Sequence, residues 1–153
     1  MPETQQRPPF RRAVVGVNGG PGDQDVIRLA CDVARPSRAE VIAVHIVEID
    51  WTLPLDADVA SRSDTAQQVL DTAEATAEQC RYQVEPVLLQ ARDVGAALVD
   101  EASERGADML ILSLPYRKRF GGDFALGSTI PYVFKNAPCK VWVVRERMPE
   151  ENP

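Results

Sequence analysis

The sequence predicts an α/β fold, a three-layer sandwich in which four helices cover both faces of a five-stranded parallel sheet. Short apolar runs alternate with amphipathic segments along the chain, which is the order that strand–helix–strand units produce. Several of the apolar runs contain almost no polar residues, as is typical of strands covered on both faces. The 153 residues suit one domain of this kind.

The first elements follow from β-branched runs and turn residues. Residues 13–17 form the first predicted strand, and the Asn-Gly-Gly-Pro-Gly segment 18–22 after it is turn chemistry. Asp23 is expected to cap a helix with apolar residues at helical spacing, which Pro36 stops. Residues 41–47 are almost all apolar and form the second predicted strand.

The middle of the chain continues the alternation. A loop is expected over 48–62, followed by an Ala-, Gln- and Glu-rich helix over 64–81 and a third strand over 84–90. Asp93 is placed to cap the next helix, and Gly106 is expected just after its end, where a left-handed conformation favours glycine.

The last elements surround a loop rich in glycine and basic residues. The fourth strand is expected over 109–114, the fourth helix over 129–136 and the fifth strand over 140–144. With the strand order 3-2-1-4-5, the loops after the first and fourth strands flank the point where the order reverses. Ligands of open α/β sheets bind at this point, and a helix N-terminus there favours an anion.

Composition limits the classes of protein. The apolar fraction of 44% and the charged fraction of 26% are ordinary for a globular protein, and no run reaches the roughly 20 apolar residues of a membrane span. Cys31, Cys80 and Cys139 form no C-x-x-C pair, so reduced thiols and a cytoplasmic location are expected. The expected organisation is a flexible arm over 1–10, one domain over 11–147 and a polar tail over 148–153.

The charge is unevenly distributed along the chain. The net charge is −6, yet residues 40–108 carry 15 acidic and 4 basic side chains, whereas residues 115–147 carry 7 basic and 2 acidic ones. An acidic body argues against nucleic-acid binding, which usually requires a basic domain. The basic segment indicates a local site for a phosphate-bearing small ligand or, alternatively, a solvated surface loop.

From about Arg12 to Glu146, the chain resembles the universal stress protein family. The resemblance implies an adenine nucleotide alpha-hydrolase-like fold with the strand order given above, in a family in which some members bind ATP or related adenine nucleotides and others do not. It rests on the segments 13–19, 44–46, 106–108, 126–129 and 136–144.

The chain departs from the nucleotide-binding branch of that family. This branch carries G-x2-G-x9-G-[ST], and counting back from Gly127 places Arg117 and Leu114 at the first two glycine positions. These side chains obstruct the close approach of a backbone to phosphate. Asn18 stands where an acidic residue is usual, and Ile46 stands where the family offers backbone groups to adenine.

The resemblance and the basic loop together predict a ligand site. The segment 114–127 also resembles stress-protein domains that work beside bacterial amino-acid permeases and cation antiporters, which implies ATP, AMP or cyclic di-AMP as ligand and a membrane transporter as partner. Tyr116 and Phe120 would offer stacking faces. The predicted ligand-binding residues are Asn18, Gly19, Ile46, Leu114, Tyr116, Arg117, Lys118, Arg119, Gly121, Gly122, Gly127, Ser128 and Thr129.

Other interpretations of these residues stay open. Ser128 and Thr129 donate to phosphate or only cap the last helix, and His45, the one histidine, is expected to be a core residue rather than a catalytic base. The resemblance implies a homodimer through Val141, Trp142 and Val143 on the last strand.

Catalysis finds little support in the sequence. It contains no phosphate-binding lysine loop, no nucleophile elbow and no metal-ligand cluster, so no metal is required and an efficient enzyme is not expected. Three functions follow: a nucleotide-sensing regulatory module, a stress-protein dimer that acts through protein contacts without nucleotide, and a slow nucleotide hydrolase.

Overall fold

The computed structural model describes residues 7–52, 54, 60–116 and 127–148. Its five strands form one parallel sheet in the order β3-β2-β1-β4-β5, which confirms the predicted topology. The strands are β1 (Arg12–Gly16), β2 (Glu40–Glu48), β3 (Glu85–Ala91), β4 (Met109–Leu114) and β5 (Lys140–Arg145). The helices are α1 (Asp23–Ala34), α2 (Ala60–Gln79), α3 (Val94–Glu104) and α4 (Thr129–Asn136), and a short 3₁₀ turn covers Arg35–Ser37.

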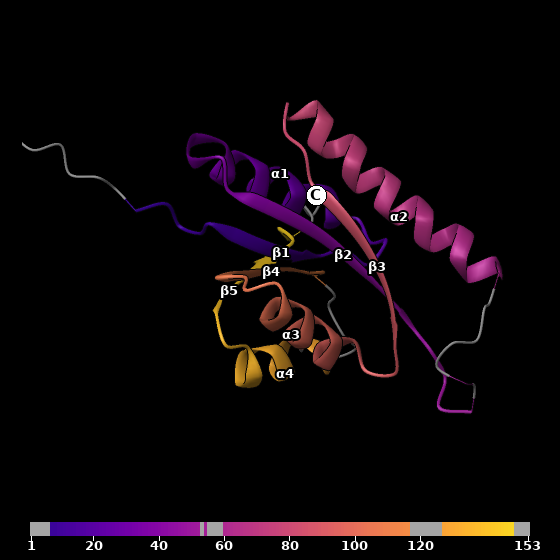
Figure 1. The fold of residues 1–153 in the computed structure, drawn as a ribbon. Helices are drawn as coiled ribbons and strands as arrows, with labels where there is room; N and C mark the ends of the chain where they lie inside the picture. Colours follow the sequence, from indigo (N-terminus) through magenta and orange to yellow (C-terminus); the bar gives the residue numbers. More distant parts are fainter. Residues whose placement is uncertain (1–6, 53, 55–59, 117–126, 149–153) are drawn as a thin grey trace, which may run out of the picture.

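The helices form the two outer layers of the sandwich. In Figure 1, α1 and α2 lie on one face of the sheet, and α3 and α4 lie on the other. Successive residues of β1 point into different cores, so Val15 packs beneath α1 and α2, whereas Val14 packs beneath α3 and α4. All three alanine and valine side chains of β1 are fully buried, which explains its uninterrupted apolar sequence.

Two helix starts differ from the prediction. Helix α1 begins with Asp23 itself after Gly22 at the N-cap, and no side-chain cap bond forms there. The Asp23 carboxylate turns back to the preceding loop instead. Helix α2 begins at Ala60, within the segment 48–62 that the sequence predicts as a loop, because residues 60–63 carry no periodic apolar signal. Asp93 caps α3 as predicted by accepting the N–H of Ala96 at 3.0 Å.

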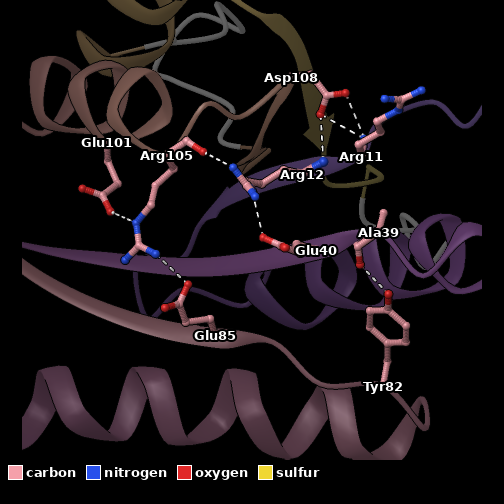
Figure 2. A network of polar contacts seen from close by, with 9 residues as sticks. All are labelled: Arg11, Arg12, Ala39, Glu40, Tyr82, Glu85, Glu101, Arg105 and Asp108. Carbon is pink, nitrogen blue, oxygen red and sulfur yellow. Dashed lines mark hydrogen bonds and ion pairs between the residues drawn. The ribbon is translucent and has the colours of Figure 1, made fainter.

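A polar network holds the N-terminal ends of the strands (Figure 2). Arg12 on β1 donates from Nε to Glu40 Oε2 at 2.7 Å and from Nη1 to the carbonyl of Arg105 at 2.6 Å. Arg105 in turn contacts Glu101 and Glu85, each at 2.8 Å. Arg12, Glu40 and Glu85 are the first residues of their strands, so this network lies at the end of the sheet opposite to the C-terminal strand ends.

The last residue of the predicted N-terminal arm belongs to the core. Phe10 is 1% exposed and meets the ring of Trp142 edge-on, with the ring centroids 6.1 Å apart. Lys140 Nζ donates to the carbonyl of Pro9 at 3.1 Å. Pro9 and Phe10, which the sequence assigns to the arm, therefore pack against β5.

Candidate functional site

A crevice of about 350 Å³ opens at the C-terminal ends of β1, β2 and β4. It lies where the strand order reverses, which is where ligands of open α/β sheets bind. Four predicted ligand-binding residues, Asn18, Ile46, Leu114 and Thr129, line it together. The full lining comprises Gly16, Val17, Asn18, Val44, His45, Ile46, Glu48, Val94, Leu98, Leu112, Ser113, Leu114, Pro115, Thr129 and Ile130.

The floor of the crevice is apolar and tightly packed. A Cβ built on Gly16 would lie 2.8 Å from Leu112 Cδ2 and 3.5 Å from Leu98 Cδ2, so a side chain there would displace the floor. The two leucines belong to the buried core beneath α3 and α4. An apolar floor beside a few polar groups is the usual pattern of a small-molecule site.

The loop between β1 and α1 is closed by a side chain of its own. The Asp23 carboxylate accepts the backbone N–H of Asn18 at 3.0 Å and that of Gly19 at 2.7 Å, and Asn18 Oδ1 accepts the N–H of Gly20 at 2.8 Å. Burial raises the pKa of Asp23, and the two N–H groups act in the opposite direction. Because these N–H groups already hold an internal carboxylate, Gly19 offers an external phosphate no spare donor in this arrangement.

His45 supports the crevice from β2. Its Nδ1 lies 2.8 Å from the carbonyl oxygen of Val17 and donates to it, and the ring is half-buried. This bond joins the ends of β1 and β2 in addition to the backbone bond from Val17 to Val44 at 2.9 Å. The interpretation of His45 as a satisfied core histidine fits this bond, although its ring also lines the crevice.

The N-terminus of α4 forms the rim of the crevice. Gly127 has a φ of +68°, and a Cβ built there meets no atom of the described residues within 4 Å. Ser128 occupies the N-cap with no side-chain cap bond, and Thr129 is the first helical residue. The first turn of α4 thus brings backbone N–H groups to the crevice, an arrangement that suits an anion.

The family model of universal stress proteins matches residues 9–145. The chain belongs to the universal stress protein family. Among curated proteins, no sequence matches it significantly.

Solved universal stress proteins share the fold at low identity. The protein of Archaeoglobus fulgidus in complex with dAMP is 20% identical with a TM-score of 0.70, and the alignment covers 88% of this chain and 98% of that one. A universal stress protein in complex with cAMP is 20% identical (TM-score 0.68, covering 89% and 97%), and an Arabidopsis thaliana protein with AMP bound is 14% identical (TM-score 0.61, covering 89% and 92%).

Four predicted site residues that the structure describes, Gly19, Tyr116, Gly127 and Ser128, do not line the crevice of this universal stress protein. Tyr116 stands beyond the crevice lining with the guanidinium of Arg145 5.2 Å from its ring centroid, and Leu114 uses its carbonyl to accept the N–H of Glu146 at 2.8 Å. Sequence reasoning missed Arg145, although it directly follows the predicted fifth strand. Arg117, Lys118, Arg119, Gly121 and Gly122 lie outside the described residues.

A second, larger hollow adjoins the crevice. It measures about 920 Å³ and is lined by the end of β2, the turn after it, the start of α2 and Arg92. Sequence reasoning placed Trp51 in an unassigned loop and left Arg92 aside. The signal that could have pointed to this hollow is Trp51 itself, an aromatic residue next to an acidic one and shortly after an apolar strand.

Within the part of the chain that the structure describes, no group of three or more His, Cys, Asp or Glu side chains is arranged to hold a metal ion. None of the described helices is both long enough and apolar enough to cross a membrane.

Proposed function

We propose that this universal stress protein is a regulatory module that binds an adenine nucleotide or a cyclic dinucleotide at the C-terminal strand ends. The observation that carries the proposal is the junction of an apolar crevice with the N-terminus of α4 at one point of the sheet. Three solved relatives hold adenine nucleotides, dAMP, cAMP and AMP, which supports the same ligand class here.

The crevice suggests how such a ligand would be oriented. The adenine ring would rest on the floor formed by Leu98 and Leu112, next to the backbone of Ile46. The phosphate would lie toward Thr129, because the β1–α1 loop already holds the Asp23 carboxylate. The basic segment 117–119 follows β4 by two residues and would add charge attraction for the phosphate.

Ligand binding would act by changing a contact between this domain and another protein. We propose that ligand binding changes how the domain engages a partner, and that a membrane transporter is the partner, as the resemblance of segment 114–127 implies. We also propose a homodimer through Val141, Trp142 and Val143, because these three residues are only half-buried on an edge strand of the sheet. Such a dimer would carry two ligand sites.

A second function, a dimer that acts without nucleotide, is favoured by one observation. The backbone N–H groups of Asn18 and Gly19 are occupied, and Leu114 and Arg117 replace two glycines of the binding branch. Fewer phosphate donors then remain than in a glycine-rich site. Slow nucleotide hydrolysis is a third function, separated from the first by product formation over time.

Calorimetry on dialysed protein tests the proposal. AMP, ATP, cAMP and cyclic di-AMP are titrated, with adenosine as the ligand that lacks phosphate. We expect saturable binding of at least one nucleotide and a loss of about tenfold in its affinity in the double variant Arg117→Ala, Arg119→Ala, with adenosine affinity unchanged. The control variant Arg28→Ala, Lys135→Ala removes two exposed cations elsewhere and should bind normally.

The possible results separate the three functions. If the folded domain binds none of the four nucleotides, the nucleotide-sensing function is excluded and the dimer that acts without nucleotide is favoured. Equal affinity of both double variants would remove segment 117–119 from the site while leaving the crevice in place. Release of diphosphate or phosphate from bound ATP, followed over hours, would identify the hydrolase.

A further inference from the structure

We propose that Trp51 and Arg92 form a second ring-binding site beside the crevice, and that it takes the second nucleobase of an adenine dinucleotide. Trp51 is 77% exposed, and the guanidinium carbon of Arg92 lies 5.1 Å from its ring centroid. One face of the indole is therefore covered by a cation, and most of the side chain remains open to a ligand. This proposal deepens the proposed function and rests on it.

The turn that carries Trp51 is fixed by its own hydrogen bonds. Asp50 Oδ1 accepts the backbone N–H of Thr52 at 2.9 Å and the Thr52 hydroxyl at 3.0 Å. This Asx turn places Trp51 at its tip, beyond the C-terminal end of β2. An aromatic ring held in this way loses little conformational freedom when a ligand stacks on it.

The partner cation is fixed to the same turn. Arg92 follows β3 and donates from Nη1 to the carbonyl of Asp50 at 2.9 Å. The N–H of Ile49 donates to the carbonyl of Ala91 at 2.8 Å, so two hydrogen bonds join the end of β3 to the turn after β2. The Trp51–Arg92 pair is thus a built feature of two neighbouring strand ends and not a chance contact of two surface side chains.

The hollow in front of this pair adjoins the crevice at the end of β2. Both are lined by His45, Ile46 and Glu48 at the end of β2. The hollow measures about 920 Å³, against about 350 Å³ for the crevice, so the larger space lies on the Trp51 side. A ligand with one ring in the crevice can extend past the end of β2 and place a second ring against Trp51.

The charges around the hollow select a base rather than a phosphate. Glu48 and Asp50 contribute acidic side chains to its lining, and Arg92 already interacts with the indole and with the turn. A lining that contains two acidic residues suits a phosphate poorly, whereas a neutral nucleobase offers a flat face that can stack on Trp51. The phosphates of a dinucleotide would stay nearer to the N-terminus of α4.

Fluorescence of Trp51 tests this assignment directly. The chain has two tryptophans, so the variant Trp142→Phe leaves Trp51 as the sole indole while keeping an aromatic ring against Phe10. In this variant, we expect cyclic di-AMP to quench the emission with saturation, and AMP to bind by calorimetry with no change in emission. In the otherwise wild-type chain, Trp51→Ala should lower the affinity for cyclic di-AMP about tenfold and change the affinity for AMP by less than twofold.

The controls distinguish this site from the crevice. Arg92→Gln should also lower the affinity for cyclic di-AMP and leave the affinity for AMP unchanged, whereas the exposed Arg28→Gln on α1 should change neither affinity. Binding of AMP with equal cyclic di-AMP affinity in wild type and Trp51→Ala would overturn the second site but keep the crevice. Quenching of Trp51 by AMP alone would also overturn it, because the indole would then report the crevice. Failure of cyclic di-AMP to bind the wild-type chain would overturn this site, and failure of all four nucleotides to bind would reject the proposed function as well.

Discussion

Gly19 donates its backbone N–H to Oδ2 of Asp23 over 2.7 Å, and this bond closes the loop that borders the crevice. The second carboxylate oxygen accepts the N–H of Asn18. We expect Asp23→Ala to lower the free energy of unfolding by about 1–3 kcal/mol, because two N–H groups of the loop lose a charged acceptor. Urea denaturation at pH 7 measures this change.

Asp25→Ala provides the matched control for that prediction. Asp25 also lies in the first turn of α1, but its position is exposed. Removing its charge weakens only the favourable interaction with the helix dipole, worth about 0.3–1 kcal/mol. Equal losses in the two variants would show that the loop bonds of Asp23 add nothing beyond this dipole effect.

The sheet was predictable because its signals are local and redundant. The runs 109–114 and 129–136 match β4 and α4 residue for residue, since a turn or a proline bounds each apolar pattern. The start of α2 was not predictable in this way, because the Ala-Ser-Arg-Ser segment 60–63 suits a helix or a loop equally well. The role of Asp23 was mistaken for a related reason, since an acid after glycine caps a helix or closes a loop and only the backbone path decides between them.

A second prediction concerns stability at low pH. Burial raises the pKa of Asp108, but the backbone N–H groups of Arg12 and Arg11 outweigh it and hold this pKa below its ordinary value (Figure 2). The resulting stabilisation is complete above the ordinary carboxyl pKa of about 4 and is lost as the pH falls through the lower folded-state pKa. Asp108→Asn should therefore lower the free energy of unfolding at pH 7. In acid, the free energies of unfolding of the variant and the wild type should converge.

Urea midpoints between pH 7 and pH 2.5 measure this convergence. The control is Asp100→Asn, an exposed position on α3. A constant gap between wild type and Asp108→Asn across this range would contradict the assignment of the pKa shift to the folded state. The expected gap at pH 7 is about 1–3 kcal/mol, the usual cost of weakening hydrogen bonds to a charged acceptor.

Two glycines with the same backbone conformation separate folding from binding. Gly127 and Gly106 have φ values of +68° and +62°, so alanine at either position should cost about 1 kcal/mol of stability. Only Gly127 lies at the crevice rim. Gly127→Ala should also weaken AMP binding at least fivefold, because a side chain two residues before Thr129 would stand close to the proposed phosphate position, whereas Gly106→Ala should leave AMP affinity unchanged. Equal AMP affinity in the two variants would remove Gly127 from the site.

The candidate site was only partly predictable from the sequence. Asn18, Ile46, Leu114 and Thr129 meet in the crevice because parallel strands bring their C-terminal ends to one edge, a consequence of topology alone. The contact between Trp51 and Arg92 was not predictable in this way. It depends on an Asx turn and on two side chains 41 positions apart, and no periodic pattern records such a pairing.

The two edge strands offer a sharp test of assembly. Val143 on β5 is half-buried at the edge where we propose a homodimer, whereas Leu88 on β3 is 41% exposed at the opposite edge. A lysine on an edge strand opposes pairing with another strand by placing a charge in the contact. Val143→Lys should therefore convert a dimer into a monomer in sedimentation equilibrium, and Leu88→Lys should leave the dimer intact. Circular dichroism of both variants verifies that the sheet is retained. A monomeric wild type, or dissociation by Leu88→Lys instead, would exclude β5 as the dimer interface.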